Sequence, residues 1–223
     1  MRTRSSSLAI VTIGAALLMN VGPIAGPRAS ERQDRMAMAE SGPTASQVAL
    51  RQAMRKLWSD HVFWTREYVV AAIAGTGDAQ AAATRLLKNQ EDIGAAIAPF
   101  YGKEAGDGLT ALLKQHIVVA VDVVSAAKAN DQAKLQEASA RWKQNANEIA
   151  AFLSRANSNW PSQALTEAMT MHLETTTREV VARLQKNYDD DVRAFDAIFD
   201  HILRMADVLS DGIIKQFPDR FAN

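Results

Sequence analysis

The chain contains four histidines, and each lies near the middle of a different amphipathic segment. His61, His116, His172 and His201 are spaced 55, 56 and 29 residues apart. Imidazole is partly neutral near pH 7 and is the commonest metal ligand among protein side chains. If the chain folds back on itself at short turns, all four rings reach about the same height. The spacing therefore predicts either a metal site or a polar layer inside a helical core.

Methionine adds a second type of candidate ligand beside the last two histidines. Met169 lies three residues before His172, and Met205 lies four residues after His201. Thioether and imidazole together form a donor set that suits copper, whereas three or four imidazoles can also hold zinc. Both methionines also belong to apolar stripes, where methionine commonly fills gaps in a core. Haem ligation by one or two of the histidines stays open as well.

Acidic and threonine side chains near the histidines are candidates for orienting the rings. A carboxylate that accepts an imidazole N–H fixes the tautomer of that ring. A threonine four residues after a histidine can donate to the imidazole or to a carbonyl of its own helix. The candidates for these supporting roles are Asp60, Thr65, Asp92, Thr176 and Asp207, with Glu67, Asp122, Glu179, Asp196 and Asp200 as further acidic candidates.

Residues 1–30 have the pattern of a secretory signal peptide. Arg2 and Arg4 precede an apolar run from Leu8 to Met19, and small residues follow. This run is shorter than the roughly 20 residues that span a bilayer. We expect export to the periplasm or the cell exterior. The organisation predicted after the signal peptide is a disordered leader at 31–45, one helical-bundle domain at 46–217 and a tail at 218–223.

The composition excludes several kinds of site and partner. Cysteine is absent, which excludes disulfides, thiolate metal sites and cysteine nucleophiles. The 25 Lys and Arg residues balance the 25 Asp and Glu residues, and the two signs are interspersed. No basic surface for nucleic acid or for an anionic membrane is therefore predicted. No integral membrane domain is expected once the signal peptide is removed, and the sequence does not indicate a protein partner.

The motifs of the common enzyme classes do not occur in the sequence. It has no Gly-x-Ser-x-Gly nucleophile motif, no glycine-rich phosphate loop, no His-Glu-x-x-His and no dinucleotide fingerprint. The Glu-x-x-His pairs of di-iron bundles are absent too. The sequence therefore favours a binding or structural protein over an enzyme.

Apolar residues recur at spacings of three and four over nearly the whole mature chain, which predicts helices and no strands. Helix breaks are expected at 75–78, 99–102, 130–131 and 157–161, where Gly, Pro, Asn and Asp cluster. A further break at 187–191 contains neither Gly nor Pro, and without it the last two segments form one long rod. Six helices joined by short turns predict an all-α antiparallel bundle.

A weak internal repeat of about 56 residues runs through these segments. The pattern Arg-x-x-x-Asn at 85–89 recurs at 141–145, each time on the segment after a histidine. His172 continues the histidine series, so the repeat predicts three helical hairpins with the third diverged.

Counting outward from the predicted turns shows which side chains share a height. The members of each pair lie about 14 or 15 residues on either side of their turn, and a helix rises about 1.5 Å per residue. One polar layer is therefore predicted, formed by the pairs His61 with Gln90, His116 with Asn145 and His172 with His201.

Three segments resemble an uncharacterised bacterial family of exported helical bundles. They are residues 57–66 (LWSDHVFWTR), 86–94 (LLKNQEDIG) and 205–218 (MADVLSDGIIKQFP). The resemblance covers roughly residues 48 to 220. It implies a helical-bundle fold. Members of that family sometimes carry automatic enzyme labels such as glycosyltransferase, whereas this sequence lacks the motifs and the sheet that such an activity needs.

Two functional hypotheses follow from the sequence. In the first, the exported bundle binds copper or zinc through His61, His116, His172 and His201. In the second, it is a non-catalytic envelope or stress-related interaction domain whose histidines are structural or sense pH. Three imidazole nitrogens at about 2.0 to 2.1 Å from a common point would favour the first.

Overall fold

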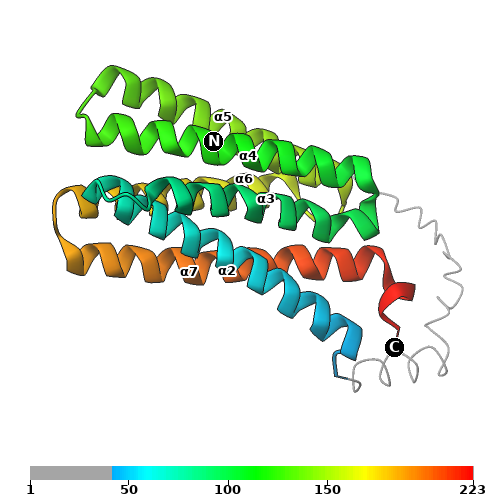
Figure 1. The fold of residues 1–223 in the computed structure, drawn as a ribbon. Helices are drawn as coiled ribbons and strands as arrows, with labels where there is room; N and C mark the ends of the chain where they lie inside the picture. The colour runs from blue at the N-terminus through cyan, green and yellow to red at the C-terminus, as the bar shows by residue number, and fades with distance from the viewer. Residues whose placement is uncertain (1–41, 223) are drawn as a thin grey trace, which may run out of the picture. The chain divides into compact units, whose positions relative to one another are not determined.

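A computed structural model describes residues 42–222, which form six α-helices and one short 3-10 helix. This part of the chain contains no strand, so the predicted all-α bundle is confirmed (Figure 1). The predicted signal peptide and the leader up to residue 41 lie outside the described residues. The elements are α2 (Ala45–Ala74), α3 (Ala79–Tyr101), α4 (Lys103–Lys128), α5 (Gln132–Ala156), α6 (Ser162–Leu184), α7 (Tyr188–Gln216) and η1 (Pro218–Phe221).

The predicted turn near residue 187 is present, and α6 and α7 are separate helices. Lys186 takes a left-handed backbone conformation with φ 58°, which is uncommon outside glycine. Asn187 then caps α7, because its side chain accepts a hydrogen bond from the backbone N–H of Asp190. Lys186 and Asn187 thus form this turn, whereas turns between helices more often contain glycine or proline.

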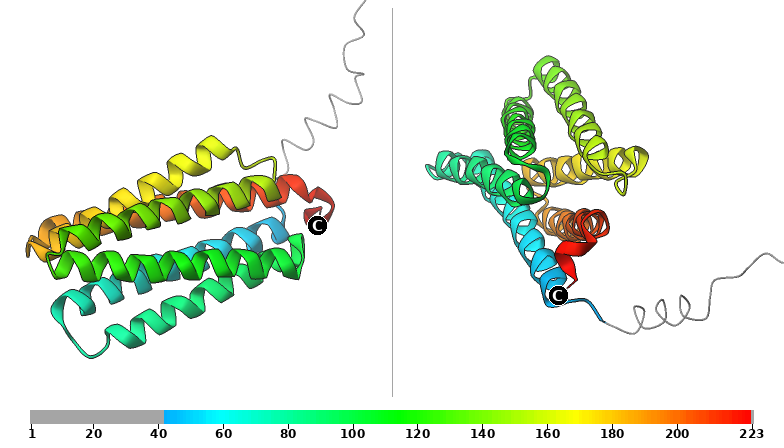
Figure 2. Two further views of the ribbon diagram at one scale, coloured as in Figure 1. Left: turned by 90° about the horizontal axis from the view of Figure 1, so that it is seen from above. Right: turned by 90° about the vertical axis from the view of Figure 1, so that its right-hand side faces the viewer.

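The helices pack in chain order around a closed ring. Each of α2 to α6 packs against the helix that follows it, and α7 returns to pack against α2. The end-on view in Figure 2 shows this arrangement. The hairpins α2–α3, α4–α5 and α6–α7 therefore follow one another around the ring, as the three predicted repeats require.

Buried apolar side chains form one large cluster and two smaller ones. The large cluster includes Met54, Ile93, Leu113 and Ile202, toward the end of the bundle where α2 begins. The two smaller clusters lie further along α2 and α4, around Val69 and around Val123 with Trp142. On α4 and α6 the histidine lies between the residues of the large cluster and those of the smaller ones, whereas on α7 His201 is flanked by Ile198 and Ile202 of the large cluster.

Helix α4 is long and apolar enough to cross a membrane by length and composition alone, with a mean hydropathy of 1.5 over its most apolar 18 residues. In the bundle it packs between α3 and α5, and 44% of that window is buried.

Residues 218–222, which follow α7, pack against the helices of the bundle. Phe221 is only 5% exposed, and its ring lies 5.8 Å from that of Phe100. The hydroxyl of Thr44 donates to the Phe221 carbonyl at 3.0 Å, next to the start of α2. Burial of the aromatic ring thus draws the end of the chain onto the bundle.

Helices α3 and α4 cross closely at two glycines. A Cβ on Gly94 would lie 1.9 Å from Thr110 Oγ1 and 2.5 Å from the Gly106 carbonyl oxygen. A Cβ on Gly106 would meet the Gly94 carbonyl oxygen at 2.7 Å. Only a residue without a side chain allows the two backbones to come this close.

We expect Gly94→Ala to lower the free energy of unfolding by about 1 to 3 kcal/mol, because the added methyl overlaps a neighbouring backbone. Gly108→Ala on α4 is the matched control, since its nearest contact is the Phe152 ring at 3.2 Å. Alanine favours helix over glycine by about 0.5 to 1 kcal/mol, so the control should be neutral or stabilising. Urea unfolding of both variants measures the difference. Equal effects at the two positions would contradict the close crossing.

Candidate functional site

The four histidine rings lie together in one buried cluster. His172 is its centre: the centroid of its ring is 5.6 Å from that of His61, 6.1 Å from that of His116 and 6.1 Å from that of His201. None of the four side chains is more than 5% exposed. The predicted layer is therefore present, and its rings also converge laterally, which residue counting does not reveal.

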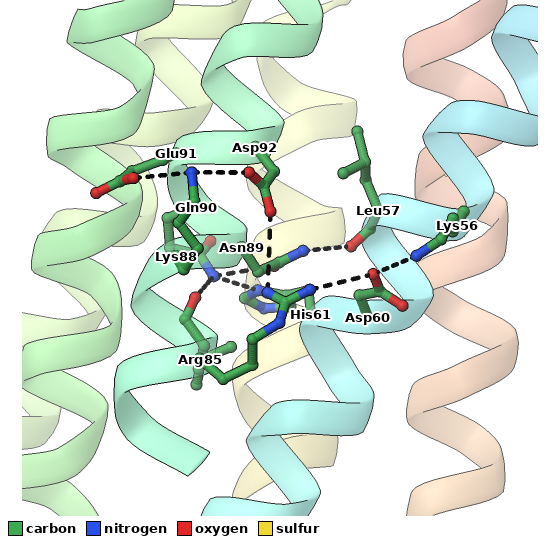
Figure 3. A network of polar contacts seen from close by, with 11 residues as sticks. Lys56, Leu57, Asp60, His61, Arg85, Lys88, Asn89, Gln90, Glu91 and Asp92 are labelled. Atoms are coloured by element: carbon green, nitrogen blue, oxygen red, sulfur yellow. Dashed lines mark hydrogen bonds and ion pairs between the residues drawn. The ribbon is translucent and has the colours of Figure 1, made fainter. Parts of the chain in front are cut away.

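The first two hairpins are each held in register by the same hydrogen bond. Asn89 Nδ2 donates to the backbone carbonyl of Leu57 at 3.0 Å (Figure 3). Asn145 Nδ2 donates to the backbone carbonyl of Leu112 at 3.1 Å. Each of these carbonyls lies four residues before the histidine of its own hairpin, and the two asparagines are 56 residues apart. The repeat in the sequence is thus a repeat of one specific contact.

The third hairpin makes this contact with a histidine in place of asparagine. His201 lies 56 residues after Asn145, and its ring hydrogen-bonds the backbone carbonyl of Ala168, four residues before His172. We assign the bond to Nδ1–H, because His201 Nε2 has no hydrogen-bond partner. The imidazole N–H thus takes the place of an amide N–H, and the second ring nitrogen, Nε2, has no hydrogen-bond partner.

Both ring nitrogens of His116 are engaged. The indole Nε1–H of Trp142 can only donate, and it lies 3.1 Å from His116 Nε2. Nε2 is therefore the acceptor, and Nδ1–H donates to Asn145 Oδ1 at 2.8 Å. Burial lowers the pKa of His116 to about 4, so the ring is neutral near pH 7. A metal ion can reach His116 only by displacing one of these partners.

His61 is held more loosely. Its Nδ1 lies 3.3 Å from Gln90 Nε2. The two N–H groups of that amide also face the Leu86 carbonyl at 2.8 Å and Asn89 Oδ1 at 3.1 Å (Figure 3). Three acceptors thus compete for two hydrogens. Burial, and secondarily the nearby His116, lower the pKa of His61 to about 3.

The layer contains most of the buried side-chain atoms that lack a hydrogen-bond partner. Within the described part of the chain there are five such atoms, and three belong to the layer: Gln90 Oε1, His172 Nδ1 and His201 Nε2. A fourth is Nε1 of Trp58, whose ring packs edge-on against His61. An unpaired buried polar group costs about 1 to 3 kcal/mol. Two of these atoms are imidazole nitrogens on the adjacent helices α6 and α7, which makes them the available ligand atoms.

A cavity gives access to His201 from the surface. It has a volume of about 150 Å³ and is lined by residues of α6 and α7 together with Trp160 and Pro161. Ala168, His201, Arg204 and Met205 are among its walls, and Arg204 is exposed. His201 is therefore in contact with this cavity, while its unpartnered Nε2 is itself buried.

The predicted supporting carboxylates pair with basic side chains and not with the imidazoles. Asp60 contacts Lys56 at 2.6 Å, and Asp207 contacts Arg55 at 2.6 Å. Asp92 contacts Lys88 at 3.1 Å (Figure 3). These aspartates lie on helix faces where a lysine or arginine side chain is closer than a buried imidazole ring. Their predicted role in orienting histidines is corrected accordingly.

The two predicted threonines bond to their own helices. Thr65 Oγ1 donates to the His61 carbonyl at 2.7 Å, and Thr176 Oγ1 donates to the His172 carbonyl at 2.8 Å. A helical threonine hydroxyl reaches the carbonyl four residues earlier more easily than a ring that points away. Both threonines therefore touch the backbone of a histidine and not its imidazole.

The two candidate methionines lie in the main apolar cluster. Met169 is 5% exposed and Met205 is 7% exposed. Met205 also borders the cavity that His201 lines. Both methionines therefore fill space in the apolar core. Met205 lines the same cavity as His201, and Met169 does not.

No three His, Asp or Glu side chains in the described residues already surround a common point as a metal site. The rings are close, but their nitrogens are not yet arranged as three ligands of one ion. Metal binding through these histidines therefore stays a prediction, and any bound ion requires the rings to turn.

A buried charge cluster was not predicted from the sequence. Arg66 on α2 contacts Glu179 Oε1 at 2.6 Å and Asp191 Oδ1 at 2.9 Å, and Arg183 contacts Asp191 Oδ2 at 3.0 Å. Both acids are 1% exposed. Burial raises the pKa of Glu179 to about 7, against the lowering effect of Arg66. No local pattern signals this cluster, because Arg66 is more than 100 residues away from both acids.

Comparisons with protein families, with curated proteins and with solved structures found no match. The resemblance to an exported helical-bundle family therefore stays a prediction.

We expect the free energy of unfolding to fall as the pH drops from about 6.5 to about 4.5. Burial keeps His61 and His116 neutral when folded, with pKa values of about 3 and about 4, whereas the unfolded chain binds protons near pH 6.5. Each such histidine removes about 1.4 kcal/mol per pH unit below its unfolded pKa. Urea unfolding across this range measures the slope.

Two variants separate the contributions to this slope. His116→Gln removes one titrating ring, so stability should fall less steeply. Glu179 acts in the opposite sense, because its raised pKa lets the folded state hold a proton that the unfolded chain releases above about pH 4.5. Glu179→Gln should therefore steepen the fall. A slope that is the same in all three proteins would show that these groups do not titrate as their burial implies.

Proposed function

We propose that this protein binds one copper ion as Cu(I), with His172 Nδ1 and His201 Nε2 as the primary ligands and His61 as a third. The observation that carries the proposal is the replacement in the third hairpin. The first two hairpins make their cross-helix contact with asparagine, which suffices for the fold. The third uses histidine and leaves two imidazole nitrogens without partners on adjacent helices.

The ring separations support a shared ion. Two imidazoles bound to one ion at about 2.0 to 2.1 Å have centroids about 5 to 6 Å apart, depending on the angle at the metal. The His172 centroid is 6.1 Å from that of His201 and 5.6 Å from that of His61. Rotations of the rings about their side-chain bonds can therefore bring nitrogens to one point while the helices stay in place.

The surroundings favour a monovalent soft ion over zinc. In the described residues no carboxylate hydrogen-bonds a histidine of the layer, so the charge of a bound ion has no direct counter-charge there. Burying the second positive charge of zinc is more costly than burying the single charge of Cu(I). Met205, which shares a cavity wall with His201, adds a thioether of the kind that selects Cu(I).

The proposed place of action is the periplasm or the cell exterior, because of the signal-peptide pattern in residues 1–30. The proposed role there is to bind the ion and not to catalyse a reaction. Nothing in the layer provides an activated nucleophile: the threonine hydroxyls bond to helix carbonyls, and both nitrogens of His116 are engaged.

The decisive variant is His201→Asn. Asparagine makes the same carbonyl contact at positions 89 and 145, so the variant keeps the hydrogen bond to Ala168 and loses only the free nitrogen. We expect the wild-type protein, purified without a histidine tag, to bind one Cu(I) per chain under reducing conditions. The variant should bind more than about 100-fold more weakly, since it lacks a direct ligand. Competition with a chromophoric Cu(I) chelator measures the affinities.

His116→Gln is the matched control, because both nitrogens of His116 are already engaged. This variant should keep the wild-type stoichiometry. Thermal unfolding of each protein without metal confirms that it is folded. If His201→Asn binds copper as tightly as the wild type, the assignment of ligands is wrong. If the wild type binds zinc and not copper, the identity of the ion is wrong. If it binds neither, the layer is structural and the interaction-domain alternative takes its place.

A further inference from the structure

A second cavity lies beyond the histidine layer, on the side of the smaller apolar clusters. It has a volume of about 150 Å³ and is enclosed by residues of α2, α3, α4, α5 and α6. Its walls are mainly apolar side chains, among them Val69, Ile117, Val124, Trp142 and Val180. None of the four histidines lines it, so it is separate from the proposed copper site.

Most polar groups in the wall of this cavity already have partners. The hydroxyls of Thr65, Thr176 and Thr177 donate to carbonyls of their own helices. The Trp142 indole N–H donates to His116, and the Tyr68 hydroxyl pairs with Ser125. The wall therefore presents methyl groups and ring faces to an occupant, and an apolar molecule fits it better than a polar one.

The mouth of the cavity is open to solvent. Ser139 and Val181 belong to its lining, and both are exposed, Val181 by 43%. These residues, on α5 and α6, place one side of the cavity at the surface of the bundle. This distinguishes the cavity from a closed packing defect.

We propose that this cavity binds a small apolar molecule about the size of one aromatic ring. A dry cavity of about 150 Å³ lined by aliphatic and aromatic side chains, engineered in another protein, takes up benzene or xenon. The volume here is about the same, and most of the lining side chains are apolar. Most ligand pockets combine such apolar walls with few polar groups, which matches this one.

Benzene is the probe for this site. We expect saturable binding to the wild-type protein, seen as amide shifts in NMR spectra that cluster around the cavity, together with a higher melting temperature at saturation. Ala120→Leu extends a side chain into the cavity from α4 and should abolish both effects. Ala95→Leu makes the same change at an exposed position of α3 and should leave both unchanged.

A second variant keeps the test informative if Ala120→Leu does not fold. Val180→Ala enlarges the cavity and should shift its preference from benzene toward a bulkier ligand such as naphthalene. The proposal is overturned if the wild type shows no saturable benzene binding, or if benzene binds equally well to folded Ala120→Leu. It is also overturned if the NMR shifts cluster around His201 and Met205, which line the other cavity.

Discussion

One hydrogen bond, repeated in each hairpin, organises this bundle. A side chain on the second helix donates to a carbonyl on the first, one turn before the histidine. That carbonyl already serves its own helix, so its second lone pair accepts the bond. Because the donor side chains are buried, a slip of either helix would leave a donor unpaired at a cost of about 1 to 3 kcal/mol. The contact thus fixes the register of three hairpins and brings the three first-helix histidines to one height.

The third hairpin makes this contact with His201 in place of an asparagine. As a result, two imidazole nitrogens without hydrogen-bond partners lie on adjacent helices. Asn145 both donates to Leu112 and accepts from His116, so its amide satisfies two partners. His201 donates to Ala168 but leaves its own Nε2 and the Nδ1 of His172 unpaired. The proposed copper site uses these two nitrogens, because a lone pair on nitrogen is what a metal ion requires.

The sequence predicts the fold and the height of each histidine, because helix periodicity and turn residues are local signals. The sequence predicts fewer of the side-chain contacts between different helices. Gln90 was expected beside His61, and it is there, but the register contact is made by its neighbour Asn89, which residue counting did not distinguish. Asp60 and Asp207 looked like partners of histidines because they are near in sequence, whereas basic residues on the same or adjacent helices hold them. Asp191 lies in the first turn of α7, and its burial against Arg66 depends on the packing of helices that are distant in the sequence.

Burial of the rings also affects the pH at which their nitrogens are free of protons and can act as ligands. A solvated imidazole near pH 6.5 is shared between a proton and a metal ion. Inside this bundle desolvation disfavours the charged form, so the pKa of His172 lies well below its ordinary value and that of His201 is lowered as well. Protons therefore compete less for these nitrogens than they do for a solvated imidazole. The same desolvation opposes a divalent ion without a counter-charge, which supports Cu(I) over zinc as the ion of the proposed site.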